Sequence, residues 1–231
     1  MELKDFKKFE KSIGYEFKNK DLLKEALTHR SYLNENHKWK LPHNERLEFL
    51  GDAVLELAVT EDLFEDFPDY EEGTLTAYRA ALVNYQMMAK VAQEAGIEKY
   101  ILLSHGESKD TSGRAREVIL ANACEALIGA IYMDSGYGSA KKFSDKFVMT
   151  HLKEVIKTGL YKDAKSLLQE KTQAETKQTP SYKVLSEYGP DHKKSFKVGV
   201  YLGERLLATG EGLAKQDAEV DAAKKALKEL D

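Results

Sequence analysis

Residues 44–55 read Asn-Glu-Arg-Leu-Glu-Phe-Leu-Gly-Asp-Ala-Val-Leu, and they carry more information than any other stretch of the chain. On a helix of 3.6 residues per turn, Glu45, Glu48 and Asp52 fall within one narrow stripe. Glu48 and Asp52 are like charges four residues apart, which costs roughly 0.2–0.5 kcal/mol in an isolated helix. Stability alone therefore does not explain the acidic stripe. The opposite side of the helix is apolar and predicts a core-facing surface of Leu47, Leu50, Val54 and Leu57.

Several carboxylates on one rigid face suit a hard divalent cation such as Mg²⁺, which takes oxygen ligands in near-octahedral geometry. A solvated acidic face is the commoner interpretation of such a stripe, so a second feature is needed to decide.

That feature is the stretch at 116–132, Arg-Glu-Val-Ile-Leu-Ala-Asn-Ala-Cys-Glu-Ala-Leu-Ile-Gly-Ala-Ile-Tyr. On a helix, Asn122, Glu125 and Gly129 share a face. Small residues beside a carboxylate let another helix approach closely. The opposite face is predicted to be core and consists of Leu120, Cys124, Leu127 and Ile131. The sequence thus predicts two helices, each with an apolar back and an oxygen-rich front.

Together these stretches resemble the two signature segments of the ribonuclease III family, the Mg²⁺-dependent endonucleases of double-stranded RNA. Residues 44–52 match the family's Asn-Glu-Arg-Leu-Glu-Phe-Leu-Gly-Asp motif at every position. Residues 119–130 match its Ile-Leu-Ala-Asp-x-x-Glu-Ala-x-x-Gly-Ala pattern, except that Asn122 stands where Asp is usual. Shorter matches lie at residues 27–32 and 72–79.

The resemblance implies a role for each matched position. Glu48, Asn122 and Glu125 would bind Mg²⁺, for which Mn²⁺ can substitute, and Asp52 and Glu125 would be the catalytic residues. Two further acidic positions, Glu45 and Glu72, would be auxiliary at the cleavage site. Family members act as homodimers with two cutting sites and leave short 3′ overhangs, and they process rRNA and mRNA precursors.

The C-terminal part changes periodicity and predicts a second domain. We expect a helical domain over residues 1–157, a linker over 158–163 and an α-β-β-β-α domain over 164–231. The overall fold class is therefore an all-α endonuclease domain followed by a small α+β domain. Within these domains we expect an N-cap at Asn44, a polar loop at 104–113, a helix at 164–174, strands at 181–186, 195–201 and 205–210, and a last helix with an alanine-rich stripe.

This element order resembles the double-stranded RNA-binding domain, which recognises the A-form shape over ~16 bp. By that resemblance, Gln169, Gln173 and His192 would contact minor grooves. Lys215, at the start of the last helix, would contact phosphates. Family members often carry a second lysine next to it, but Gln216 stands there in this chain. We expect that difference to weaken RNA binding.

Composition and charge limit the classes of protein to which the chain can belong. The 42% hydrophobic content of this 231-residue chain is enough for packed cores, and no apolar run approaches the roughly 18 residues of a membrane span. The charged N-terminus is unlike a secretory signal, so we expect a cytoplasmic protein. Cys124 is the only cysteine and is predicted to be a core residue. Residues 162–231 carry 13 Lys/Arg and 12 Asp/Glu, so RNA binding there needs a local patch rather than bulk charge.

Two alternatives remain open at this point. The chain could be a double-stranded RNA-binding protein with a silent nuclease fold, or an enzyme disabled by a deliberate Asp→Asn change at position 122. A metal site built on His43 with Glu45 and Glu48 is a third arrangement, although His43 lies just outside the helix and is expected to pack or cap there.

Overall fold

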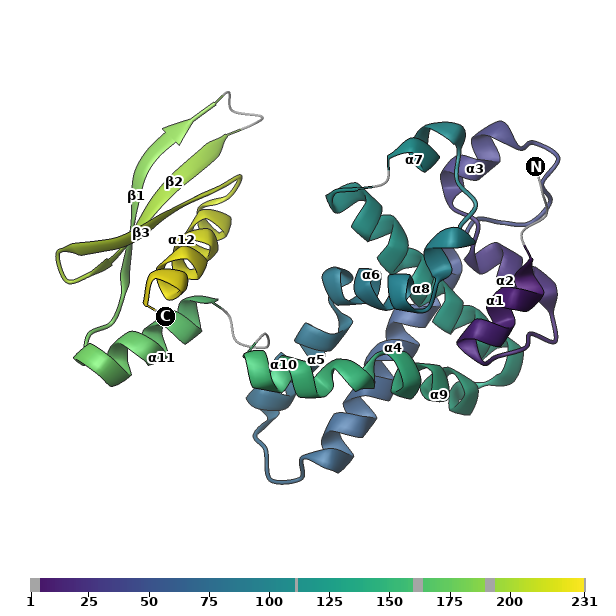
Figure 1. The fold of residues 1–231 in the computed structure, drawn as a ribbon, viewed down its shortest axis with the longest axis horizontal. Coiled ribbons are helices and arrows are strands. Elements are labelled where there is room, and N and C mark those ends of the chain that lie inside the picture. Colours follow the sequence, from purple (N-terminus) through teal and green to yellow (C-terminus); the bar gives the residue numbers. More distant parts are fainter. Residues whose placement is uncertain (1–4, 111, 160–163, 190–193, 231) are drawn as a thin grey trace. The chain divides into compact units, whose positions relative to one another are not determined.

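The computed structural model describes residues 5–110, 112–159, 164–189 and 194–230. Two compact units make up the chain, Met1–Tyr161 and Lys162–Asp231 (Figure 1). The first unit is helical, as predicted, and the second is a three-stranded sheet with two helices.

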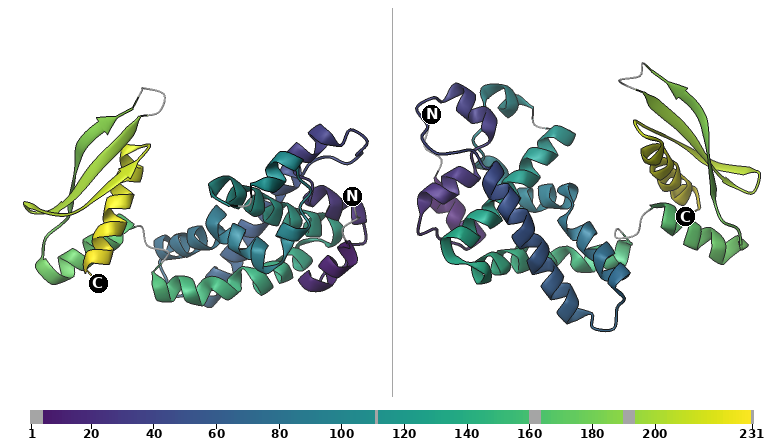
Figure 2. Two further views of the ribbon diagram at one scale, coloured as in Figure 1. Left: turned by 45° about the horizontal axis from the view of Figure 1, so that its top comes forward. Right: turned by 180° about the vertical axis from the view of Figure 1, so that it is seen from behind.

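The first unit is built from short helices around two long ones. In chain order the helices are α1 (Phe6–Ile13), α2 (Lys20–Ala26), α3 (Arg30–Glu35), α4 (Glu45–Asp66), α5 (Glu72–Val83), α6 (Tyr85–Glu94), the 3-10 turn η1 (Ile97–Lys99), α7 (His105–Lys109), α8 (Arg114–Ser135), α9 (Tyr137–Phe147), η2 (Met149–His151) and α10 (Leu152–Thr158). From behind, α4 runs diagonally across the unit (Figure 2).

The two signature segments lie on the two long helices, α4 and α8, and these pack directly against each other. Glycines set how closely they approach. A Cβ added at Gly51 would lie 1.8 Å from the Glu125 carbonyl oxygen, and one at Gly129 would lie 2.2 Å from the Leu47 carbonyl oxygen. The predicted close approach beside Glu125 is therefore confirmed, and it brings the backbones of the two acidic segments into contact.

Helix α8 is the core helix of this unit. Its buried residues include the four predicted ones, Leu120, Cys124, Leu127 and Ile131. By length and apolarity it meets the criteria for a membrane span, with a mean hydropathy of 1.3, but 56% of that window is buried inside the unit. Surrounding helices, rather than lipid, account for its apolar surface.

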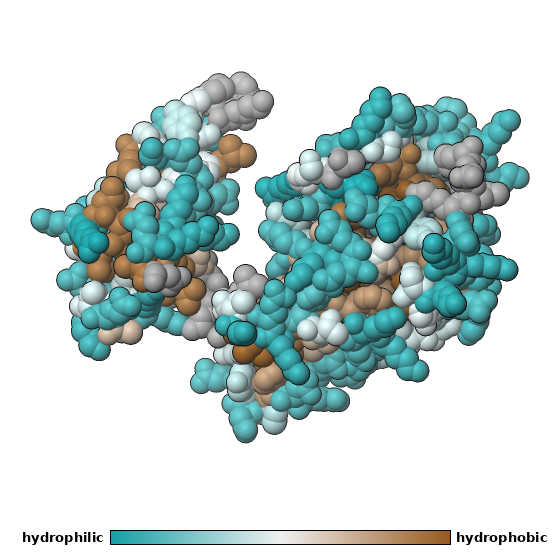
Figure 3. All heavy atoms as spheres, viewed as in Figure 1, coloured by the Kyte–Doolittle hydropathy of each residue, from teal (hydrophilic) through white to brown (hydrophobic). Residues whose placement is uncertain are grey.

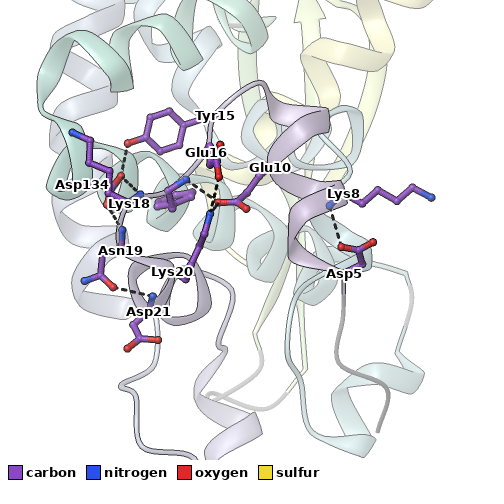
Figure 4. Close-up of polar contacts among 11 residues, drawn as sticks. Asp5, Lys8, Glu10, Tyr15, Glu16, Lys18, Asn19, Lys20, Asp21 and Asp134 are labelled. Atoms are coloured by element: carbon purple, nitrogen blue, oxygen red, sulfur yellow. Dashed lines mark hydrogen bonds and ion pairs between the residues drawn. The ribbon is translucent and has the colours of Figure 1, made fainter.

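Polar contacts fix the N-terminal helices to the end of α8 (Figure 4). The Asp134 carboxylate accepts hydrogen bonds from the Tyr15 hydroxyl at 2.7 Å and from the backbone amides of Lys18 and Asn19 at 2.9 and 2.8 Å. Burial opposes the charge of Asp134, but these hydrogen bonds outweigh it and lower the pKa of that carboxyl. The contacts hold α1 and α2 against the core.

Two local predictions for this unit were wrong, and a third, for Asn44, was right in position only. Leu57 is 57% exposed, because its position on α4 lies at the edge of the buried stripe, which Leu55 and Ala58 fill instead. Asn44 occupies the N-cap position of α4 but makes no side-chain cap, since its backbone is already helical. The polar segment after Leu103 is not simply a loop: the Ser104 hydroxyl caps the short helix α7 by accepting a hydrogen bond from Glu107.

The second unit has the predicted α-β-β-β-α order. Its elements are α11 (Ala164–Thr176), β1 (Ser181–Tyr188), β2 (Ser195–Leu202), β3 (Arg205–Gly212) and α12 (Lys215–Leu230). The strands pair antiparallel in the order β1-β2-β3, and each extends one or two residues beyond its prediction. Gly203, with φ of 61°, makes the turn between β2 and β3.

Alanines on α12 let the helix pack closely on one face of the sheet. The predicted stripe is confirmed: Ala218, Ala222, Ala223 and Ala226 are all fully buried. A Cβ at Gly210 of β3 would lie 2.2 Å from the backbone nitrogen of Ala222, so this contact also requires a glycine. On the surface of the unit, hydrophobic side chains gather along β1 (Figure 3), where Val184 and Leu185 are exposed.

Candidate active site and nucleic-acid interface

Helices α4 and α8 bring four oxygen-bearing side chains together, which we call the acidic cluster: Glu48, Asp52, Asn122 and Glu125. Glu48 interacts electrostatically with Asp52 and has a hydrogen-bonding contact with the Asn122 side chain. Glu125 interacts with both Asp52 and Glu48. The Gly51–Gly129 contact described above makes this proximity a consequence of backbone packing.

The acidic cluster is electrostatically strained. Burial raises the pKa of Glu125 to about 8, and the neighbouring charges of Asp52 and Glu48 add to the effect. Burial also raises the pKa of Glu48, with Glu45 and Asp52 contributing, while the contact with Asn122 works in the opposite direction. Without a counter-charge, this arrangement therefore disfavours full ionisation and holds a proton on Glu125 at neutral pH.

All donors in the acidic cluster are carboxylate or amide oxygens, the ligands that a hard cation such as Mg²⁺ prefers. A cation would also relieve the repulsion that raises the pKa values. The residues present therefore fit a hard divalent ion. Across the described ranges, no three His, Cys, Asp or Glu side chains are gathered closely enough to count as a formed metal-binding group.

Glu45 lies one turn before Glu48, at the edge of the acidic cluster. Its carboxylate is half exposed and lies 3.7 Å from Nη1 of Arg30 and 3.8 Å from Nδ1 of His43. The alternative metal site of His43, Glu45 and Glu48 is not assembled among the described residues. Nδ1 of His43 is buried and has no hydrogen-bond partner among the residues that the structure describes.

Glu72 is not brought to the acidic cluster within one chain. It begins α5 and lies at the part of α4 that carries Thr60 and Phe64, which are 8 and 12 residues beyond Asp52, a rise of about 12–18 Å along the helix. Glu72 instead lines a cavity of about 400 Å³, together with Phe64 and Tyr70.

In the second unit, the predicted RNA-contacting residues lie on its helices. Gln169 and Gln173 are both exposed and lie one turn apart on α11. Lys215 is the first residue of α12; its Nζ lies 3.4 Å from Glu187 and 5.5 Å from the centre of the Phe196 ring. His192 lies outside the described residues.

A helical unit with an acidic cluster between its two long helices is followed by an α-β-β-β-α unit, and this arrangement is that of a nuclease domain joined to a double-stranded RNA-binding domain. Family models agree with this class: a ribonuclease-III-like model matches residues 19–152 and a double-stranded RNA binding motif matches residues 164–230. The chain belongs to the ribonuclease III family of double-stranded RNA endonucleases.

Its similarity to curated relatives extends over nearly the whole chain. Ribonuclease 3 of Nitratiruptor sp. is 47% identical over 99% of this chain and 98% of its own length. Ribonuclease 3 of Borreliella burgdorferi is 43% identical, covering 97% and 91%. The crystal structure of the nuclease domain of ribonuclease III from Campylobacter jejuni is 43% identical, with a TM-score of 0.57, over 64% of this chain and 97% of that one.

One surface of α4 is apolar and exposed, and it was not predicted from the sequence. Phe49 and Phe64 are 82% and 72% exposed, and Leu57 lies between them. On a 3.6-residue helix, positions 49, 57 and 64 lie on one side, directly beside the acidic stripe. The spacing of these residues is visible in the sequence, but a division of α4 into an acidic face and a buried face leaves this third face out.

Proposed function

We propose that this chain is a Mg²⁺-dependent endoribonuclease that cuts double-stranded RNA as a cytoplasmic homodimer, with Mn²⁺ able to replace Mg²⁺. Residues 1–157 would form the catalytic domain, 158–163 the linker and 164–231 the RNA-binding domain. The observation that carries the proposal is the meeting of Glu48, Asp52, Asn122 and Glu125 across the contact between α4 and α8.

Each residue of the acidic cluster has a distinct task in this proposal. Glu48, Glu125 and the carbonyl oxygen of Asn122 would hold the metal. Bound Mg²⁺ supplies Lewis acidity that polarises a phosphate and lowers the pKa of a water. Asp52 is the most exposed of the four side chains and orients the attacking water by accepting a hydrogen bond from it. Glu45, at the edge, is auxiliary.

The homodimer is supported by the exposed apolar side of α4. Large apolar side chains such as Phe49 and Phe64 are rarely left bare on one helix face unless a partner covers them. A similar solved structure, the nuclease domain of Campylobacter jejuni ribonuclease III, has a region involved in dimer formation. A second copy of this chain is therefore the partner we propose for this surface.

The shape of α4 favours one arrangement of the two copies. A protruding side chain, Phe49, lies near one end, and the 400 Å³ cavity lined by Thr60, Phe64 and Glu72 lies near the other. A two-fold interface uses the same patch on both copies, so antiparallel α4 helices would place each Phe49 at the other copy's cavity. Glu72 would then approach the acidic cluster of the partner. It could therefore be auxiliary at that cleavage site although it lies far from the acidic cluster of its own chain.

The experiment that tests the proposed function is incubation of a long RNA duplex with the full chain, with Mg²⁺ or with a chelator, followed by a denaturing gel. We expect short products with Mg²⁺ only, and no cleavage of a DNA duplex of equal length. An uncut RNA duplex at every Mg²⁺ and Mn²⁺ concentration would favour the silent RNA-binding alternative.

A further inference from the structure

A groove lies between α3 and the first half of α8. Its volume is about 810 Å³, and its walls include Arg30 and Asn34 from α3 and Arg114 and Val118 from α8. Helix α7 lies beside α3 (Figure 1), where the backbone amide of His105 donates a hydrogen bond to Glu35 at 2.8 Å. This hydrogen bond joins α7 to α3 at one wall of the groove.

Both walls of the groove lead to the acidic cluster. On α8, positions 114, 118, 122 and 125 recur every three or four residues and therefore form one stripe, which runs from Arg114 to Asn122 and Glu125. On the other wall, Nη1 of Arg30 lies 3.7 Å from Oε1 of Glu45, one turn before Glu48. A polymer strand held at the acidic cluster could therefore continue into this groove.

The charge of the groove is opposite to that of the acidic cluster. Its lining includes two arginines and one carboxylate, Glu107. The Arg30 side chain is 72% exposed and its contact with Glu45 is long, so this ion pair adds little to the stability of the fold. Arg30 is therefore not needed to hold the fold. Guanidinium groups are well suited to phosphate oxygens, which they bind in a bidentate geometry.

We propose that the α3–α8 groove binds backbone phosphates of the RNA strand that is cut, with Arg30 and Arg114 as positioning residues and Asn34 as a neutral donor. This inference rests on the proposed function, since it takes duplex RNA as the substrate. It assigns to the nuclease unit a phosphate-binding track of its own, in addition to the RNA contacts of the second unit.

The test measures kcat and KM of the full chain on a short RNA duplex over a range of salt concentrations. The variants are Arg30→Ala, Arg30→Lys and Arg30→Ala combined with Arg114→Ala. Lys142→Ala is the matched control, because Lys142 is an exposed cation on α9, outside the groove. Thermal melting of each variant checks that its fold is intact.

We expect Arg30→Ala to raise KM about threefold to tenfold, to leave kcat within about twofold, and to reduce the salt dependence of KM by about one counterion. Arg30→Lys should recover part of the loss, and the double variant should show a larger rise in KM. Lys142→Ala should behave like the unmodified chain.

Three results would contradict phosphate binding by the groove. The first is an unchanged KM and salt dependence in the double variant, and the second is an equal effect of Lys142→Ala, which would mean bulk charge. The third is a fall in kcat alone, which would mean that Arg30 acts only by holding Glu45. If the unmodified chain cuts no duplex, the proposed function fails. The same variants are then compared by their binding to the duplex. An unchanged salt dependence of binding in the double variant would contradict phosphate binding by the groove.

Discussion

At the scale of single residues, Asn122 is the position where this chain departs from the family pattern. A neutral amide in place of a carboxylate keeps one oxygen donor but removes one negative charge, and Mg²⁺ favours charged oxygen ligands. We expect Asn122→Asp to shift the Mg²⁺ titration of RNA cleavage to about tenfold lower concentration. Cleavage that appears only in the Asp variant would identify this chain as a disabled form, and no change would show that Asn122 is not a ligand.

Glu125 is the residue whose charge the fold disfavours most clearly. Its pKa of about 8 in the folded state lies above the ordinary value of 4.5, so between these values the folded state binds a proton that the unfolded state lacks. Without divalent ions, stability should therefore fall as pH rises from about 5 to about 8. After allowance for partial exposure, we expect a loss on the order of 1–3 kcal/mol.

Thermal melting in a chelator at pH 5 and pH 8.5 measures this effect. Glu125→Gln should remove most of the decline, whereas Glu117→Gln, an exposed position on the same helix, should retain it. A melting temperature that does not fall with pH in the unmodified chain would show that Glu125 is solvated and ionises normally.

At the scale of elements, the contact between α4 and α8 depends on two glycines. A methyl group at position 129 would meet the Leu47 carbonyl oxygen at 2.2 Å, so Gly129→Ala forces the helices apart. We expect a loss of about 1–3 kcal/mol and a lower melting temperature, together with reduced cleavage because Glu125 moves away from Glu48. Gly138→Ala is the control: that glycine lies in α9 with no atom within 4 Å of an added methyl group. Equal melting temperatures for the two variants would contradict the close packing.

The same helices show how far sequence reasoning reaches. Period and motif predicted the two helices, with Glu48 and Asp52 on one face of α4 and Asn122 and Glu125 on one face of α8, because the spacing within each helix is a local property. They failed for Leu57, whose burial depends on where α9 and α5 lie, and for Asn44, whose backbone conformation depends on the preceding loop. Local patterns do not contain such tertiary information.

In the whole molecule, a single chain does not explain how Glu72 could act at the cleavage site. In the proposed dimer, the acidic cluster that Glu72 approaches belongs to the second copy. The proposed dimer is tested by Phe49→Asp, which places a charge in the apolar surface of α4. Sedimentation should give a dimer for the unmodified chain and a monomer for this variant. Leu213→Asp, at an exposed apolar position of the second unit, should remain dimeric. If both variants are dimers, the dimer interface does not include the apolar surface of α4.

In our proposal the acidic cluster cuts duplex RNA while the second unit supplies most of the binding. Cleavage and binding of one RNA duplex are measured in parallel for Glu125→Gln and for the unmodified chain, with Mg²⁺ present for cleavage. We predict that cleavage by the variant falls by at least about 10²-fold while its duplex affinity stays within about threefold. Undiminished cleavage, or an equal loss of cleavage and binding, would contradict the claim.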